Sequence, residues 1–336
     1  MMPKARRAAF STLACLLLPC AAAAAFDGSR DDVAGFLEEM RTRHGFTREW
    51  LETLLGSASS DPRILDLISR PAERVRPWHE YRGHFVTEQR IAEGVEFWSR
   101  HRDRLASVER ETGVPASVIV GILGVETFYG RITGRFRVLD ALATLAFDYA
   151  PRSPYFRAEL EQFLLLGREE RDLDLLKVEG SYAGAMGRPQ FMPRSYRSYA
   201  VDGDGDGRRD LWNSWDDVIA SVANYLARHG WRAGEPVEAP ARFWYPDASW
   251  PAPGGIDTDE TVDSLRDKGV AFETPLGGAA PALFIRVEGS DGPELHAGFH
   301  NFSVITKYNR SVMYALAVND LGTTIEGRLP PSAGGG

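Results

Sequence analysis

Apolar side chains recur at helical spacing along the first third of the chain. One run contains Phe36, Leu37 and Met40, three positions that share one face of a helix and leave the opposite face polar. Prolines between such runs are expected to bound the helices. The pattern therefore predicts a helical N-terminal domain over residues 26–107.

Helical patterning continues over residues 108–231. Glycines, aspartates and candidate catalytic side chains are concentrated in this stretch. Functional side chains gathered on a regular scaffold are typical of an active site, so we expect these residues to form the catalytic core. Within it, residues 141–171 could also pack with the N-terminal domain.

The character of the sequence changes over residues 232–300. Clusters of proline and glycine separate short apolar runs such as residues 282–287, a pattern typical of strands and turns. We therefore predict a small β domain there, a helical return to the core over residues 301–327 and a disordered tail over residues 328–336. The predicted fold class is α+β, mainly α.

The first 25 residues are typical of an export signal. Lys4, Arg6 and Arg7 precede a short apolar run and a stretch of small residues, and the run is too short to span a bilayer. We therefore predict a signal peptide over residues 1–25 and a periplasmic protein. In the alternative, Cys20 becomes the lipidated N-terminus of an outer-membrane lipoprotein.

Composition narrows the classes of function. The 336 residues include 39 Lys and Arg against 47 Asp and Glu, a formal net charge of −8, and 43% are hydrophobic. The negative charge argues against a nucleic-acid partner, and the hydrophobic content argues against disorder. The two cysteines, Cys15 and Cys20, lie in the expected leader. A disulfide scaffold and a thiolate zinc site are therefore unsupported.

A predicted helix that is otherwise apolar carries one acidic residue, Glu126. It follows Ile122 and Leu123 by four and three residues, so it shares their face of the helix. A carboxyl held against apolar side chains loses solvation, which raises its pKa and keeps it protonated near neutral pH, as a general acid requires. The alternative is a structural carboxylate paired with a neighbouring arginine such as Arg131 or Arg135.

Small residues dominate the first half of residues 181–193. They allow a ligand or another backbone to approach closely, while Ser181, Gln190 and Phe191 offer hydrogen bonds and a stacking face. A tight contact between helices would use the same small residues, so this stretch alone does not define a site.

Aromatic and amide side chains are also grouped at Tyr308, Asn309 and Tyr314. Groups of this kind bind sugars when they line a cleft, whereas buried tyrosines in a core helix are the commoner arrangement. Both interpretations remain open at this point.

Alternating aspartates and glycines follow the 181–193 stretch. Asp202, Asp204 and Asp206 stand at positions 1, 3 and 5 of an EF-hand pattern, with glycine at position 6. Position 12 is an asparagine rather than the usual glutamate, so Asp216 or Asp217 could close a longer loop. A calcium loop is predicted, with a solvated Asp/Gly turn as the alternative.

Several motifs together resemble one known family, the membrane-bound lytic murein transglycosylase B family. The resemblance extends from about Tyr81 to Gly322. The motifs are Gly94-Val95-Glu96-Phe97-Trp98, Gly124-Val125-Glu126-Thr127, Leu139-Asp140-Ala141-Leu142-Ala143-Thr144-Leu145, Ala183-Gly184-Ala185-Met186-Gly187, Gln190-Phe191-Met192-Pro193 and Ser221-Val222-Ala223-Asn224-Tyr225.

The resemblance implies a lysozyme-like core and a set of site residues. Glu126 matches the single catalytic acid and base. The residues implied to bind substrate are Tyr81, Arg152, Ser181, Gln190, Phe191, Tyr225, Tyr308, Asn309 and Tyr314. The implied ligands of a structural Ca²⁺ in an elongated EF-hand over residues 202–216 are Asp202, Asp204, Asp206, the Arg208 carbonyl and Asp216. No organic cofactor is implied.

Two positions depart from the family pattern. Arg188-Pro189 stands where the family usually has glycine before the glutamine, which affects the loop beside Gln190. Arg152-Ser153 replaces what is often a pair of arginines, which weakens an expected contact to the peptide stem.

The implied activity is cleavage of the β-1,4 bond between N-acetylmuramic acid and N-acetylglucosamine without water, forming 1,6-anhydro ends. The expected partners are peptidoglycan glycan strands and cell-wall synthesis proteins, with no nucleic acid, and a monomer is expected. A lysozyme-type hydrolase and a non-catalytic peptidoglycan-binding scaffold are the alternatives.

Overall fold

The computed structural model describes residues 25–70, 76–244 and 255–330. The predicted signal peptide lies almost entirely outside the described residues, together with both cysteines and the last six residues of the predicted tail. The start of that tail is ordered locally, because the backbone N–H of Arg328 donates to the Ile325 carbonyl.

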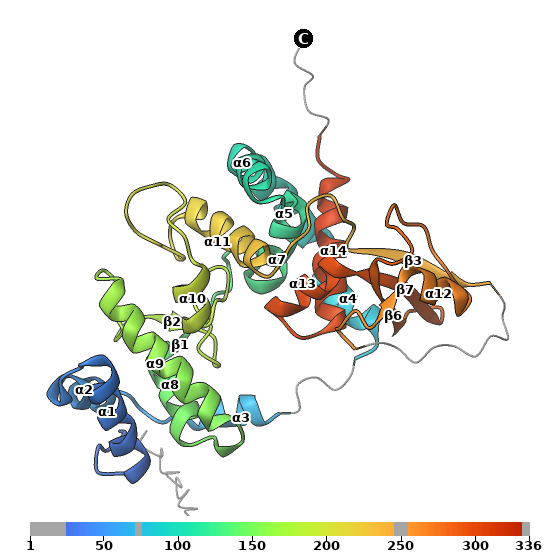
Figure 1. Ribbon diagram of the computed structural model, residues 1–336. Coiled ribbons are helices and arrows are strands. Elements are labelled where there is room, and N and C mark those ends of the chain that lie inside the picture. Colours follow the sequence, from blue (N-terminus) through green and yellow to red (C-terminus); the bar gives the residue numbers. More distant parts are fainter. Residues whose placement is uncertain (1–24, 71–75, 245–254, 331–336) are drawn as a thin grey trace, which may run out of the picture.

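Five helices form a lobe at one end of the molecule (Figure 1). They are α1 (Asp31–His44), α2 (Arg48–Gly56), α3 (Pro62–Ser69), α8 (Val138–Phe147) and α9 (Ser153–Glu169), with a 3₁₀ turn at Ala150–Arg152. Hydrogen bonds join the early and late segments, from the Ser59 N–H to Asp140 over 2.8 Å and between His44 and Glu161 over 2.7 Å. The start of the chain thus packs with residues 138–169.

Eight other helices of the described residues form a larger body. They are α4 (Trp78–Phe85), α5 (Glu88–Arg100), α6 (Arg102–Thr112), α7 (Ala116–Thr127), α10 (Pro193–Tyr199), α11 (Trp215–Arg228), α13 (His300–Tyr308) and α14 (Val312–Glu326). Because α4, α5 and α6 pack on α7, α11 and α14, the structure divides the expected domain over residues 26–107 between the lobe and the body. A two-stranded pairing of β1 (Phe136–Arg137) with β2 (Glu179–Gly180) lies between the two parts.

Helix α7 is the centre of the body, and α14 crosses it at close range. A Cβ atom at Gly121 would lie 2.3 Å from the carbonyl oxygen of Val318, and one at Gly322 would lie 2.2 Å from that of Ser117. Glycine at both positions is what lets the two backbones approach this closely. Eleven of the twelve residues of α7 are buried, the exception being Glu126.

The predicted β domain is a five-stranded antiparallel sheet with strand order β4-β6-β7-β3-β5. Its elements are β3 (Glu238–Phe243), β4 (Glu260–Thr261), α12 (Val262–Asp267), β5 (Val270–Ala271), β6 (Pro281–Glu288) and β7 (Pro293–Phe299). The sheet and α12 enclose a small core of their own that includes Leu265, Phe284 and Phe299. The prediction of an α+β fold that is mainly α is confirmed.

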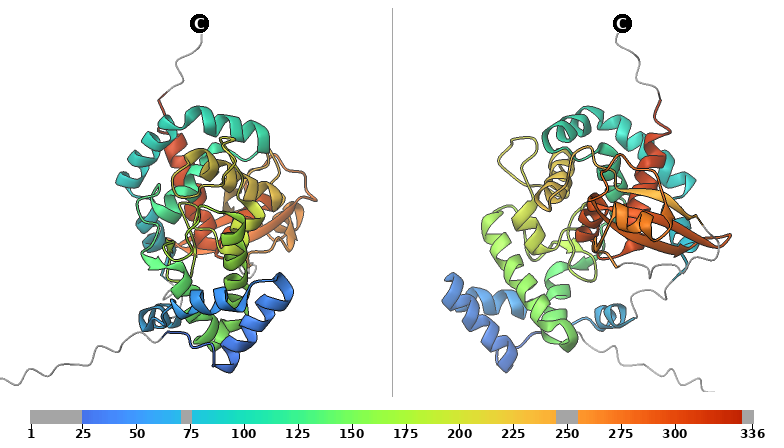
Figure 2. Two further views of the ribbon diagram at one scale, coloured as in Figure 1. Left: turned by 90° about the vertical axis from the view of Figure 1, so that its left-hand side faces the viewer. Right: turned by 45° about the vertical axis from the view of Figure 1, so that its right-hand side comes forward.

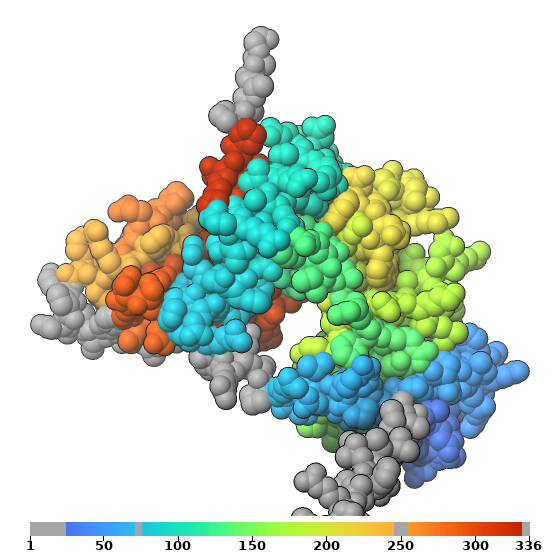
Figure 3. All heavy atoms as spheres, turned by 180° about the vertical axis from the view of Figure 1, so that it is seen from behind, coloured from blue at the N-terminus to red at the C-terminus, as the bar shows by residue number. Residues whose placement is uncertain are grey.

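The lobe and the β domain lie on opposite sides of the body (Figure 2). Seen from behind, a hollow separates the surface of the body from the lobe (Figure 3). Across the three described stretches, no helix combines the length and the apolar character that crossing a membrane requires.

Candidate active site

Glu126 lies in the last turn of α7, and Tyr314 of α14 donates its hydroxyl hydrogen to Glu126 Oε1 over 2.6 Å. Burial raises the pKa of the Glu126 carboxyl to about 7, and the Tyr314 hydrogen bond opposes that shift. Neither cause is a second carboxylate. Arg131, the alternative partner, instead pairs with Glu93. The carboxyl can therefore give and take a proton near neutral pH.

The backbone turns sharply just after Glu126. Phe128 and Tyr129 have φ angles of 51° and 55° in the left-handed region that residues with side chains rarely adopt. Two hydrogen bonds hold the turn, because the Thr127 hydroxyl donates to the Arg188 carbonyl over 2.9 Å and the Tyr129 hydroxyl donates to the Arg90 carbonyl over 3.1 Å. Strained backbone beside a titrating carboxyl is typical of a functional site.

The loop that faces this turn is folded around its own side chains. The Gln190 amide donates to the Gly187 carbonyl over 2.8 Å and to the Thr133 carbonyl over 3.1 Å, and Gln190 itself has a φ of 53°. The Ser181 hydroxyl oxygen accepts from the N–H groups of Ala183 and Ala185. In this structure, therefore, Ser181 and Gln190 shape the loop.

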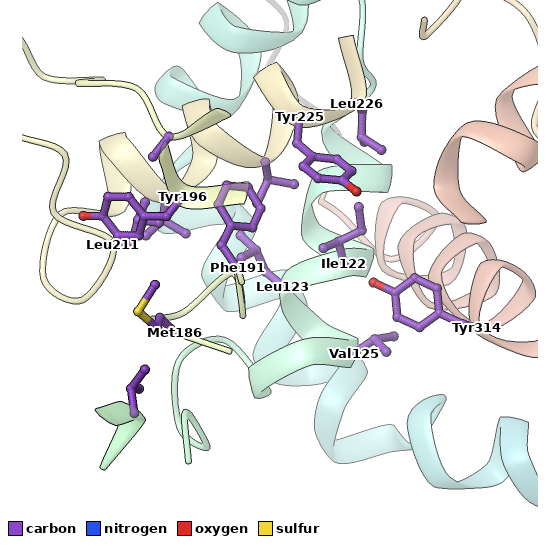
Figure 4. Close-up of a cluster of buried hydrophobic side chains, with 14 of the residues drawn as sticks. Ile122, Leu123, Val125, Met186, Phe191, Tyr196, Leu211, Tyr225, Leu226 and Tyr314 are labelled. Atoms are coloured by element: carbon purple, nitrogen blue, oxygen red, sulfur yellow. The ribbon is translucent and has the colours of Figure 1, made fainter. Parts of the chain in front are cut away.

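Four aromatic rings line the site beside Glu126. The Phe191 ring lies 5.5 Å from Tyr225 and 5.8 Å from Tyr308, and Tyr308 lies 6.5 Å from Tyr314, between ring centroids. Figure 4 shows Phe191 and Tyr225 side by side over α7, with the Tyr314 hydroxyl directed at the same helix. The wall is anchored by hydrogen bonds from Tyr308 to the Pro189 carbonyl over 2.7 Å and from Tyr225 to the Lys307 carbonyl over 2.6 Å.

The tyrosines of this wall remain neutral. Burial raises the pKa of Tyr225, Tyr308 and Tyr314, and the nearby Glu126 adds to the rise for the last two. Their hydroxyl groups are consequently hydrogen-bond donors across the whole physiological pH range. The sequence did not decide whether Tyr308 and Tyr314 belong to a core helix or line a cleft. In the structure both lie beside the Glu126 carboxyl.

The other predicted substrate-binding residues lie on α4, at the end of α13 and on the lobe. Tyr81 is buried in α4, where it adds to the pKa rise of Tyr314. Asn309 is exposed at the end of α13. Arg152 is exposed on the lobe, with its guanidinium carbon 4.6 Å from the centroid of the Tyr155 ring.

Tyr155 is a candidate that sequence reasoning missed. It is 40% exposed at the start of α9, and its hydroxyl adds to the pKa rise of Tyr225 in the body. An exposed ring on the lobe beside Arg152 is a candidate contact for a long ligand. The sequence signal was only an aromatic residue in a predicted helix, which by default is assigned to the core.

The acidic loop, residues 202–217, brings three carboxylates close together. Asp202, Asp204 and Asp217 each place an oxygen within 4.8 Å of the others. Asp216, the closing ligand that the resemblance implies, is half-buried and faces Arg104, with 3.6 Å between Arg104 Nε and Asp216 Oδ1. Asp206 lies outside the group of three.

The start of α11 explains why Asp217 joins Asp202 and Asp204. Ser214 caps the helix by accepting from the Asp217 N–H, so Asp217 stands in the first turn with its side chain directed back into the loop. There its carboxylate accepts the N–H groups of Gly203 and Asp210, each over 2.7 Å. Asp217, unlike Asp216, is therefore buried and aimed at the other two carboxylates.

The fold and this site define a class: a mainly helical, lysozyme-like protein with one partly buried acid beside an aromatic wall. The family description "Transglycosylase SLT domain" matches residues 28–323. The chain belongs to this family, which agrees with the resemblance seen in the sequence motifs.

Individual relatives agree with that assignment. The chain is 42% identical over 299 residues to the membrane-bound lytic murein transglycosylase B of Escherichia coli, covering 86% of this chain and 81% of that protein. It superimposes on the lytic transglycosylase SltB1 of Pseudomonas aeruginosa with a TM-score of 0.85 and 48% identity, covering 88% and 97% of the two chains.

A third relative bears on the acidic loop. The lytic transglycosylase Slt35 of Escherichia coli was solved in complex with calcium, and it matches this chain with a TM-score of 0.82 and 40% identity, covering 90% of this chain and 96% of that one. The coordinating groups that calcium prefers are carboxylate and carbonyl oxygens. The cluster of Asp202, Asp204 and Asp217 offers ligands of that kind.

Proposed function

We propose that the protein cleaves the β-1,4 bond between N-acetylmuramic acid and N-acetylglucosamine and leaves 1,6-anhydro-N-acetylmuramic acid ends. Its class is that of its family: it is a lytic transglycosylase that acts on peptidoglycan. The observation that carries the finer proposal is Glu126, a single carboxyl whose pKa lies near 7 and is set by burial rather than by a second carboxylate.

The proposed reaction uses this one carboxyl twice. Protonated Glu126 gives its proton to the glycosidic oxygen as the bond to the departing N-acetylglucosamine breaks. The N-acetyl group of the muramic acid stabilises the positive charge that develops at C1. Glu126, now a carboxylate, takes the proton of the C6 hydroxyl while that oxygen bonds to C1, so the enzyme ends in its starting state.

The mechanism explains why one carboxyl suffices. Most glycosidases place two carboxyl groups on either side of the bond, one as acid and one as nucleophile or base. Here the substrate supplies both the internal nucleophile and the stabilising group. The Tyr314 hydrogen bond holds the Glu126 oxygen and stabilises its carboxylate form, which exists between the two proton transfers.

The aromatic wall and the loop are the proposed glycan-binding surface. Tyr308, which is partly exposed, offers a ring face for a sugar next to Glu126, and the buried rings of Phe191 and Tyr225 pack against it and shape the same surface. We assign further substrate contacts to the remaining residues that the resemblance implies. They are Tyr81, Arg152, Ser181, Gln190, Asn309 and Tyr314.

Calcium is the proposed structural ion of the acidic loop. Asp202, Asp204 and Asp217 would hold it, and Asp206 and the Arg208 carbonyl are further oxygen donors on the same loop. Asp216, which the family resemblance implies, is the alternative closing ligand. A hard cation would neutralise part of the mutual repulsion of these carboxylates and order the segment between α10 and α11. No step of the reaction needs it.

The proposed location is the periplasm, where peptidoglycan lies. The predicted signal peptide would direct export, and Cys20 would anchor the protein to the outer membrane if it is lipidated. Glycan strands are the proposed partners, together with cell-wall synthesis proteins, and the proposed state is a monomer.

Digestion of purified sacculi followed by mass spectrometry tests the reaction. The expected main products carry 1,6-anhydro ends, and Glu126→Gln is expected to produce none. Reducing-end muramic acid as the main product would make the protein a lysozyme-type hydrolase. Binding of glycan without turnover by the wild-type chain would make it a scaffold.

A further inference from the structure

Arg188 departs from the family pattern, and its side chain makes two contacts with the end of the acidic loop. Its guanidinium donates to the Asn213 carbonyl over 3.2 Å. The guanidinium carbon lies 4.0 Å from the centroid of the Trp215 ring, a cation–π distance. Burial lowers the pKa of Arg188, but an arginine remains charged under all conditions in which the protein is folded.

Two aromatic neighbours hold the Trp215 ring in addition to Arg188. Its ring meets the edge of Phe97 at 4.7 Å and lies 5.6 Å from the His101 ring, both at the α5–α6 junction. A ring held between two aromatic neighbours and a guanidinium has little freedom to move. Trp215 is also the first residue of α11, two positions before Asp217 of the acidic cluster.

The main chain of Arg188 contacts the end of the helix that carries Glu126. Its carbonyl accepts the Thr127 hydroxyl over 2.9 Å, one residue after the carboxyl. The side chain also lies against the turn that follows, because a Cβ at Gly130 would be 3.1 Å from Arg188 Nε and 3.2 Å from Trp215 Cη2. Gly130, with a φ of 83°, leaves the room that this contact requires.

From these contacts we propose that Arg188 is a positioning residue that couples the acidic loop to Glu126. Its carbonyl holds the end of α7, and its guanidinium holds the loop end at Asn213 and Trp215. Ordering the loop therefore orders the turn after Glu126, and loosening the loop loosens it. This inference rests on the proposed function of Glu126, and it assigns the regulation of that site to the loop.

A small displacement of the Glu126 carboxyl would lower the reaction rate. A displacement of about 1 Å in a catalytic group lowers rates by up to about 100-fold. Removing the Arg188 side chain is expected to lower kcat about tenfold while changing KM less than twofold, because the aromatic wall that binds the glycan keeps its own anchors at Lys307 and Pro189.

The test uses full-length Arg188→Met, which keeps an unbranched side chain beside Gly130, and Arg188→Lys. The matched control is Arg228→Met, an exposed arginine at the far end of α11. Release of 1,6-anhydro products is measured with and without calcium, across pH. Arg188→Met is also expected to shift the alkaline limb of the pH profile to lower pH, because a looser turn admits water to the carboxyl. Arg188→Lys is expected to recover only part of kcat.

Hydrogen exchange supplies a readout that does not need activity. In the wild type and in Arg228→Met, removal of calcium is expected to raise exchange both in residues 202–217 and in residues 127–130. In Arg188→Met, the loop is expected to respond to calcium as before, while residues 127–130 exchange rapidly in both conditions. The effects of Trp215→Leu and Arg188→Met on exchange in residues 127–130 are expected to be less than additive, because each substitution removes the cation–π contact that the two residues share.

Two outcomes overturn the coupling. One is an Arg188→Met enzyme with wild-type kcat and pH profile. The other is calcium-dependent exchange in residues 127–130 that persists in Arg188→Met. Failure of the proposed function looks different, because the wild type would then release no anhydro products while the exchange pattern could still follow the expected coupling.

Discussion

The hydroxyl of Tyr314 lies 2.6 Å from Oε1 of Glu126, and 188 residues separate the two in the sequence. Among the described contacts of the carboxyl, this is the hydrogen bond that lowers its pKa against the effect of burial. The pKa of the candidate acid therefore depends on two helices. Burial of Glu126 at the end of α7 raises it, and the hydrogen bond donated by Tyr314 of α14 lowers it.

Tyr314→Phe is expected to raise the pKa of Glu126 further above 7, because the lost hydrogen bond favours the charged form. Hydrogen bonds to charged groups contribute about 1.5–3 kcal/mol, so the alkaline limb of the pH–rate profile should move up by about one unit. At pH 7 the second proton transfer should slow, and kcat should fall. An unmoved limb in a folded variant would show that the bond does not tune the acid.

Glu126→Gln is expected to remove activity and to stabilise the protein at neutral pH. The folded carboxyl has a pKa of about 7 against an ordinary value of 4.5, so below pH 4.5 both states keep the proton and nothing changes. Between pH 4.5 and 7 the unfolded chain releases its proton while the folded chain retains it, which favours unfolding. The penalty grows to about 3 kcal/mol above pH 7.

The measurement is thermal unfolding of the two proteins at pH 4 and pH 7.5. The Tm of Glu126→Gln should exceed that of the wild type at the higher pH and equal it at the lower. If the Tm of Glu126→Gln equalled that of the wild type at both pH values, the carboxyl would lie in a more solvated environment than the structure describes.

Asp217→Asn is expected to abolish the effect of calcium on thermal stability, whereas Asp216→Asn is expected to keep it. Asp217 lies in the carboxylate cluster, and Asp216 faces Arg104 outside it. The Tm of each variant is compared in calcium and in chelator. Loss of the calcium effect in Asp216→Asn alone would instead make Asp216 the closing ligand, as the family resemblance implies.

Gly121→Ala is expected to destabilise the protein by about 2–4 kcal/mol, since a new methyl group would overlap the Val318 carbonyl of α14. Gly83→Ala is the control: a Cβ at Gly83 would meet no neighbouring atom within 4 Å, and alanine in a helix is favoured over glycine by about 1 kcal/mol. Urea unfolding measures both. Equal stabilities would mean that α7 and α14 can separate without loss.

The sequence could single out Glu126 as the candidate acid because the relevant pattern is local. Glu126 stands alone on an apolar helix face, and that pattern is visible without tertiary structure. The carboxylates of the loop were harder to place, because one residue at the start of α11 decides which aspartate points inward. The Ser214–Asp217 cap was the available signal for choosing Asp217 over Asp216.

The division of the chain into parts was less visible. An amphipathic helix shows that it has a buried face, but the pattern does not say which segment covers that face. Helices α4 to α6 therefore looked continuous with α1 to α3, although they cover α7 and α14. Tyr155 was missed for a similar reason, since its position relative to Tyr225 depends on how the lobe sits against the body.

The position of α14 also has a consequence for how the protein is made. Synthesis proceeds from the N-terminus, so Glu126 is made long before Tyr314 and the helix that covers α7. Until those last residues arrive, Gly121 and its neighbours have no α14 to pack against, and the carboxyl lacks its hydrogen-bond donor. A chain that ends before α14 is therefore expected to lack both the helix that packs on α7 and the hydrogen bond to Glu126.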